Sequence, residues 1–159
     1  MEIKPKVYIE TSVVSYLVAK TSQNLITVAH QQITQDWWHH ELPKFEAFIS
    51  TSVTDEAKKG DLEYAQKRLD AIKDFELLEE SPVILELADE YLITLYLPDK
   101  CRVDCIHMAT ASVFAMEFMA SWNCKQIANA QIIKKIKEIN TSFGIHTPVI
   151  TTPEELYRS

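Results

Sequence analysis

Four acidic side chains and one amide stand at or near the ends of predicted strands. They are Glu10, Asp55, Glu56, Asp104 and Asn123. Mg²⁺ and Mn²⁺ prefer oxygen ligands of this kind and keep several of their waters. Carboxylates held together without a cation repel, so one of them would have to bind a proton, and a divalent ion removes that cost. If three of these carboxylates and the amide converge, the sequence predicts an all-oxygen site that suits Mg²⁺ or Mn²⁺, with Asp55 and Glu56 as alternatives for one position.

The convergence depends on the strands and helices that carry these residues. Five β-prone runs occur along the chain, at 7–9, 45–49, 75–78, 118–122 and 149–150. The longer helical segments are expected between them, at about 24–40, 61–72, 81–97, 103–116 and 132–139. Alternation of this kind favours a parallel sheet with helices on both faces. Such sheets bind ligands at the carboxyl ends of their strands, so the acidic side chains are expected along one edge.

Capping residues indicate where several of these helices begin. Thr11 or Ser12 is expected to cap a short helix after the first strand, and Asp61 to cap a later one. Ser81 precedes a proline at another helix start, with the serine as cap. The segment 103–116 is apolar nearly all round, which predicts a central, buried helix.

Composition limits the class of protein. The 159 residues fit one domain, 1–159. Neither a secretory signal nor a run near 20 apolar residues occurs, so we expect a cytoplasmic protein without a membrane span. The net charge of −7 argues against a broad phosphate-binding surface unless bound metal ions reverse the local field. Two glycines exclude a dinucleotide fingerprint. Since no secretory signal is seen, the three cysteines are expected as free thiols, and their spacing fits no common zinc pattern.

Each candidate residue also has a structural explanation. Glu10 could be a solvated acid at a strand end, and Asp104 could simply favour the positive end of its helix. Glu56 could be a surface helix residue, with Asp55 a near-equal rival for its role. Asn123 could be a turn residue. The joint pattern, and no single member, supports a functional site.

Four segments of the chain resemble the motifs of PIN-domain nucleases. Residues 7–17, Val-Tyr-Ile-Glu-Thr-Ser-Val-Val-Ser-Tyr-Leu, look like the family's opening, in which an acid precedes Thr-Ser at the end of the first strand. Residues 49–56 resemble the second motif, and 104–111, Asp-Cys-Ile-His-Met-Ala-Thr-Ala, the third. Residues 121–129 are similar to the fourth segment of VapC-like toxins from toxin–antitoxin systems. The resemblance covers nearly the whole chain, as far as 152–156.

The resemblance implies a three-layer α/β/α PIN-like fold with a central, mostly parallel sheet of four to five strands. It also implies Mg²⁺- or Mn²⁺-dependent cleavage of RNA, with Glu10, Glu56 and Asp104 as acidic ligands. Glu10 and Asn123 stand where most or many family members have Asp, so the number of ions and the turnover are left open. Asn123 is expected to orient a water, whereas Thr11 would donate a hydrogen bond to a carboxylate or phosphate.

Further roles follow from the same resemblance. Ser12 is a second candidate donor to the site, and Asp55 a further candidate acid. The expected chemistry is metal-assisted hydrolysis of a phosphodiester, in which the ion activates water and neutralises charge on phosphate. The expected partners are an RNA substrate and a small cognate antitoxin, and the family also forms homodimers. The alternative is a catalytically weak PIN-like domain that binds protein or RNA, which Asn123 and the negative charge favour.

Other conspicuous residues have mainly structural interpretations. The pair Trp37-Trp38 is typical of a core or an interface, where an antitoxin helix or a second subunit could pack. His107 shares a helix face with Asp104 but is expected as a core histidine. Lys100, Arg102 and Lys125 flank the site in sequence; each is either a contact to RNA phosphates or ordinary surface charge.

Overall fold

The sheet at the centre of the molecule has five parallel strands. The computed structural model describes residues 3–157, and within them the strand order is β3-β2-β1-β4-β5. The strands are β1 (Lys6–Ile9), β2 (Glu46–Ser50), β3 (Glu76–Leu78), β4 (Phe118–Ala120) and β5 (Val149–Thr151). Tyr8 of β1 lies opposite Phe48 on one side and Met119 on the other. The expected parallel sheet is confirmed.

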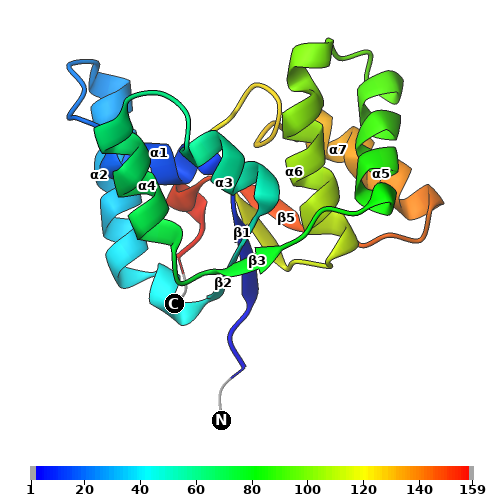
Figure 1. The fold of residues 1–159 in the computed structure, drawn as a ribbon. Helices are drawn as coiled ribbons and strands as arrows, with labels where there is room; N and C mark the ends of the chain where they lie inside the picture. The colour runs from blue at the N-terminus through cyan, green and yellow to red at the C-terminus, as the bar shows by residue number, and fades with distance from the viewer. Residues whose placement is uncertain (1–2, 158–159) are drawn as a thin grey trace.

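Seven α-helices of the described chain cover the sheet. They are α1 (Thr11–Val18), α2 (Leu25–His40), α3 (Thr51–Ala57), α4 (Leu62–Ile72), α5 (Pro82–Thr94), α6 (Arg102–Val113) and α7 (Ala130–Ser142). Figure 1 shows α1, α2 and α4 on one side of the sheet and α5, α6 and α7 on the other. Short 3₁₀ helices occupy Leu42–Lys44, Asp99–Cys101 and Pro153–Glu155. The three-layer α/β/α arrangement expected from the sequence is therefore confirmed.

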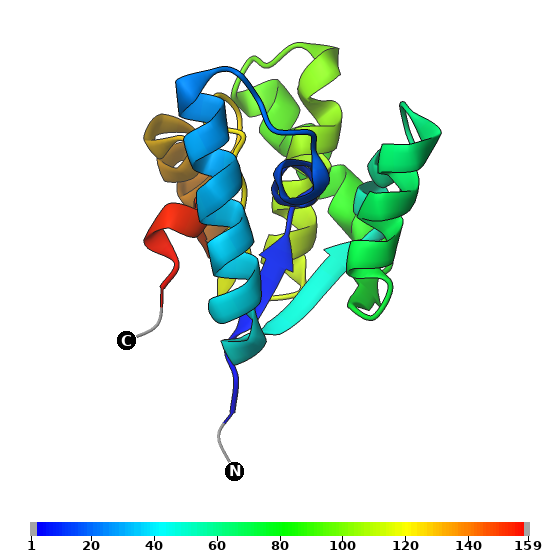
Figure 2. The same cartoon turned by 90° about the vertical axis from the view of Figure 1, so that its left-hand side faces the viewer.

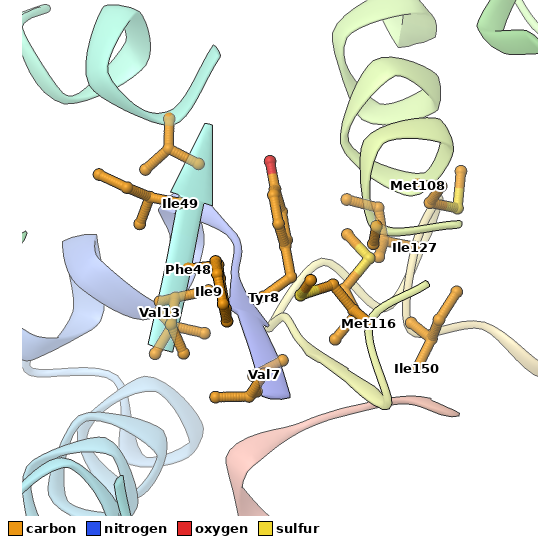
Figure 3. Packing of buried hydrophobic residues seen from close by; sticks show 14 of the residues in the cluster. Val7, Tyr8, Ile9, Val13, Phe48, Ile49, Met108, Met116, Ile127 and Ile150 are labelled. Atoms are coloured by element: carbon orange, nitrogen blue, oxygen red, sulfur yellow. The ribbon is translucent and has the colours of Figure 1, made fainter. Parts of the chain in front are cut away.

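β1 is the most deeply buried strand. Val7, Tyr8 and Ile9 have no exposed surface. Figure 3 shows the Tyr8 ring standing between side chains of β2 and those near α6, with its hydroxyl oxygen at the far end of the ring. Residues 105–112 of α6 are buried as well, so this helix is central, as predicted. Within residues 3–157, no helix combines the length and the apolar character needed to cross a membrane.

The structure corrects several predicted boundaries and caps. The N-cap of α1 is Glu10, whose side chain accepts a hydrogen bond from the Ser12 amide, so the prediction of Thr11 or Ser12 as cap is wrong. Ser81 does occupy the N-cap of α5, but its side chain makes no capping hydrogen bond. Asp61 caps α4 as expected, accepting from the amides of residues 63 and 64. β4 ends at Ala120, two residues earlier than predicted.

Candidate metal centre

The reversal of strand order places a candidate site above β1 and β4. Connections run from β1 to β2 and β3 in one direction and then return to β4 and β5 in the other. The carboxyl ends of strands at such a reversal form the usual ligand crevice of an open α/β sheet. In Figure 2 the end of α1 is seen directly above the tip of β1. Glu10 lies at that junction, and Asn123 follows β4.

Glu10 is held by three donors from its own surroundings. Glu10 is buried, with only 5% of its surface exposed. Oε1 accepts hydrogen bonds from the hydroxyls of Ser12 and Ser121, each at 2.5 Å. Oε2 accepts one from the Ser12 amide at 3.0 Å. These bonds fix the carboxylate at the start of α1 and, among the described residues, leave Oε2 with a single hydrogen-bond partner.

Glu56 approaches from α3, the helix that follows β2. Its Oε1 accepts from the Thr11 hydroxyl at 2.6 Å and lies 2.6 Å from Nε2 of His107. Among the described residues no hydrogen bond reaches Oε2. Atoms of Glu10, Glu56 and His107 that could each bind a metal lie within 4.8 Å of one another. Three separate elements, α1, α3 and α6, therefore meet at one point.

Asp104, the third predicted ligand, lies outside the group formed by Glu10, Glu56 and His107 and pairs with Asn123. The Asn123 amide nitrogen donates to Oδ1 of Asp104 at 3.2 Å. The amide oxygen of Asn123 accepts from the backbone amides of Lys125 and Gln126. That oxygen is already bonded within the turn that follows β4. Asn123 therefore contacts the site through its side-chain nitrogen, which orients Asp104. Both the predicted turn role and the predicted proximity to the site are present in the same residue.

Burial and neighbouring charges shift the pKa values of the half-buried acids Asp104 and Glu56 in opposite directions. Burial, followed by the charge of Glu10, raises the pKa of Asp104 to about 6. Burial also raises the pKa of Glu56, but the hydrogen bond and positive charge of His107 outweigh it, so the net pKa of Glu56 is lowered. Burial lowers the pKa of His107. Its hydrogen bond to Glu56 and the charges of nearby carboxylates outweigh burial, so the net pKa lies above the usual value for histidine.

The donor set fits a hard divalent cation. Glu10 and Glu56 each keep an Oε2 with room for a further partner, and Asp104 keeps Oδ2. Oxygen ligands of this kind suit Mg²⁺, Ca²⁺ and Mn²⁺ better than soft metals. Burial, followed by the charge of Glu10, raises the pKa of Asp104, and a cation bound nearby would favour its ionised form. The cluster of acidic and histidine side chains could thus bind a metal ion.

The other predicted residues lie in varied places. Thr11 and Ser12 donate to the carboxylates of Glu56 and Glu10, as expected for supporting residues. Asp55 is exposed, and no group of potential metal ligands among the described residues includes it. Ser121 and Tyr8 contact the site network without having been singled out from the sequence. For Ser121 the only signal was its place in the fourth motif.

The residues given structural interpretations are largely inside the molecule. His107 is completely buried, as predicted, and it also contacts Glu56, which its sequence position did not reveal. Trp37 is fully buried and donates to the Leu156 carbonyl at 2.7 Å, so it belongs to the core. Trp38 is partly buried against Phe75.

The flanking basic and thiol groups differ in their exposure and pairing. Lys100 and Lys125 are exposed, whereas Arg102 pairs with Asp89 at 3.0 Å. The three cysteines are free thiols: Cys101 and Cys105 are buried and Cys124 is exposed. The expectation of free thiols is confirmed.

Comparison with known proteins adds a likeness of fold. No protein-family model matches the chain, and no curated protein matches it. Among solved structures, the chain is similar to one in the crystal structure of VapBC2 from Rickettsia felis bound to a DNA fragment from their promoter. The TM-score is 0.59 and the identity 14%, over 92% of this chain and 98% of that one. At this identity the likeness establishes architecture, and the five parallel strands between two layers of helices are consistent with the PIN-like fold expected from the sequence.

Proposed function

We propose that this chain is a Mg²⁺- or Mn²⁺-dependent endoribonuclease of the PIN type that acts as the toxin of a toxin–antitoxin pair. The observation that carries the proposal is a cluster at the reversal of strand order, where ligand atoms of Glu10, Glu56 and His107 lie within 4.8 Å of one another. Asp104 lies outside that group but near enough that, after burial, the charges of Glu10 and Glu56 raise its pKa. The fold likeness to a chain of a VapBC complex supports the same assignment. A cytoplasmic location, a small antitoxin partner and a homodimer belong to this proposal.

The proposed roles follow from the contacts of each side chain. Glu10, Glu56 and Asp104 would hold the ion, which when bound activates water and neutralises charge developing on a phosphate. Thr11 holds Glu56 in place, and Asn123 holds Asp104. These hydrogen bonds spare the carboxylates from reorganising when a cation and a phosphate arrive.

Exposed lysines near the site would meet the RNA backbone. Lys125 lies two residues after Asn123, and Lys100 lies just before α6. Lys59 is close enough to Glu56 for its charge to lower the pKa of that carboxyl group. Because the net charge of the chain is −7, phosphate binding would depend on these few lysines and on the ion.

Cleavage of a single-stranded RNA tests the proposal. Wild type with Mn²⁺ should cut the RNA, EDTA should abolish cutting, and Asp104→Asn should lower the rate at least about a hundredfold, because it removes a charged ligand. Asp55→Asn is the matched control, since Asp55 is exposed and outside the cluster; its rate should stay within about twofold of wild type. Equal rates for Asp104→Asn and wild type would contradict the proposal.

A second candidate is a binding module without appreciable catalysis. One observation favours it: two backbone amides already donate to the side-chain oxygen of Asn123, so Asn123 does not offer that oxygen to an ion in addition to the carboxylates. A module of this kind would bind RNA or a protein partner with no cleavage at any Mn²⁺ concentration. The same assay, with RNA binding followed by fluorescence anisotropy, separates the two candidates.

A further inference from the structure

A buried chain of hydrogen bonds runs from the central sheet to Glu56. The hydroxyl of Tyr8 lies 2.7 Å from Oγ of Ser50 and 2.6 Å from Nδ1 of His107. Nε2 of His107 lies 2.6 Å from Oε1 of Glu56. Ser50, Tyr8 and His107 are all completely buried. The chain therefore links β2, β1 and α6 to an acid on α3 without a solvent-exposed member until Glu56.

His107 is placed to support Glu56 and is poorly placed to bind an ion itself. An imidazole binds a metal through one ring nitrogen while the other makes an outer hydrogen bond. In this site both ring nitrogens already have short contacts with protein oxygens. To bind an ion, His107 would have to break its contact with Glu56 or with Tyr8. Its ring is completely buried, so water could not replace the lost partner.

These hydrogen bonds determine which oxygen of Glu56 is available to a metal ion. Oε1 is held by both His107 and Thr11, so the carboxylate cannot rotate freely, and Oε2 is the atom that stays open. In metal sites, partners of this outer kind orient the ligand and contribute strongly to affinity. We propose that Tyr8 and His107 are positioning residues that set the affinity of the Glu56 carboxylate for a divalent cation. This inference rests on the proposed function.

Tyr8→Phe is the most direct test, because it removes one hydroxyl and leaves the ring in the core. The dissociation constant for Mn²⁺ is measured by electron paramagnetic resonance on the full chain. We expect binding about 3- to 10-fold weaker than wild type, less than the roughly 10- to 100-fold loss typical of removing a direct partner of a ligand, because Tyr8 acts through His107. Raising the Mn²⁺ concentration should then restore most of the RNA cleavage rate, since the ligands themselves remain. A dissociation constant equal to that of wild type would overturn the inference.

Tyr91→Phe provides a matched control. Tyr91 is also completely buried, and its hydroxyl donates to the side-chain oxygen of Asn140 and lies 3.5 Å from Oγ of Ser112. Ser112 lies eight residues after Asp104 on α6, about 12 Å along the helix. Tyr91→Phe therefore removes the same group from the core and should leave Mn²⁺ affinity within about twofold of wild type. An equal loss of affinity in both variants would mean that the effect is general destabilisation, which would also contradict the inference.

Substitutions of His107 distinguish positioning from direct ligation. His107→Gln keeps a donor that can reach Glu56, whereas His107→Leu does not. If His107 positions Glu56, the glutamine variant should bind Mn²⁺ more tightly than the leucine variant. If His107 is itself a ligand, both variants lose Mn²⁺ while Tyr8→Phe retains wild-type affinity, and the inference fails. Failure of the proposed function has a different signature: wild type itself binds no Mn²⁺ and cuts no RNA.

Discussion

Asp104→Asn should stabilise the metal-free protein although it weakens metal binding. Asp104 is half-buried beside Glu10, and its Oδ1 accepts from the Asn123 amide. Asparagine has nearly the same shape, and its carbonyl oxygen can accept the same hydrogen bond. The substitution therefore removes mainly a charge that is both desolvated and repelled.

The size of the effect follows from the protonation of the acid. Burial, followed by the charge of Glu10, raises the pKa of Asp104 from its usual 3.8 to about 6. At 1.36 kcal/mol for each pKa unit, the ionised form would cost the fold about 3 kcal/mol. Solvent screening of this partly exposed carboxylate reduces the figure to about 1–2 kcal/mol. For a chain of this length, that corresponds to a rise in melting temperature of roughly 3–6 °C.

The dependence on pH has a definite sign. Between about pH 4 and pH 6 the folded wild type binds more protons at Asp104 than the unfolded chain does, so its stability falls as pH rises through this window. Above about pH 6 the whole cost is present. The side-chain amide introduced by Asp104→Asn does not titrate, so the advantage of the variant should be absent near pH 4 and complete at pH 7. The titrations of Glu56 and His107 occur in both proteins and largely cancel in the difference.

Thermal unfolding with EDTA and with Mn²⁺ measures both halves of this prediction. With EDTA at pH 7.5, the variant should melt above wild type, and the gap should close towards pH 4. With Mn²⁺ at a hundred times its dissociation constant, binding should stabilise wild type by about 2.7 kcal/mol and reverse the order. A variant that melts below wild type in EDTA at pH 7.5 would refute the electrostatic argument, since removing a repelled charge would then have destabilised the fold.

Three further predictions test other parts of the structure. Asn123→Asp adds a carboxylate about 3.2 Å from Asp104, so the melting temperature should fall in EDTA and rise more steeply with Mn²⁺ than in wild type. Mn²⁺ affinity of wild type, measured by calorimetry, should fall about tenfold between pH 7 and pH 5, because Asp104 with a pKa of about 6 must lose its proton to bind the ion. Trp37→Phe deletes a buried donor to the Leu156 carbonyl and should lower stability to urea by about 1–3 kcal/mol with cleavage unchanged in folded protein.

The strands and their parallel direction could be predicted because short apolar runs alternate with helical periodicity. The end of β4 could not, since it depends on a competition between hydrogen-bond partners. The Ser121 amide still bonds to the Thr151 carbonyl across the sheet. The next amide, that of Trp122, bonds instead to the Ser12 hydroxyl. The chain leaves the sheet where the site begins, and no local pattern marks that point.

The capping error has a similar cause. Serine and threonine commonly cap helices, and Thr11 and Ser12 stand at the expected place. In the structure their hydroxyls donate to carboxylates, and Glu10 accepts the helix amide in their place. Hydroxyls can donate as well as accept, so a nearby acid can recruit them away from the backbone. Because the fold brings Glu10 and Glu56 together at this junction, both hydroxyls act there as donors.

The same logic explains why the three acids, alike in sequence, are unlike in the structure. Within residues 3–157, Glu10 receives three donors and Glu56 receives a hydroxyl and an imidazole, whereas Asp104 receives one amide group. The support for Glu56 comes from a histidine 51 residues away, itself held by a tyrosine 99 residues distant, so sequence spacing could not assign it. Because Asp104 has the least compensation and a raised pKa, it is the carboxylate at which a cation changes the energy most. A divalent ion bound at the site would supply the positive charge that Asp104 lacks, and it would also contact the oxygens of Glu10 and Glu56 that remain open.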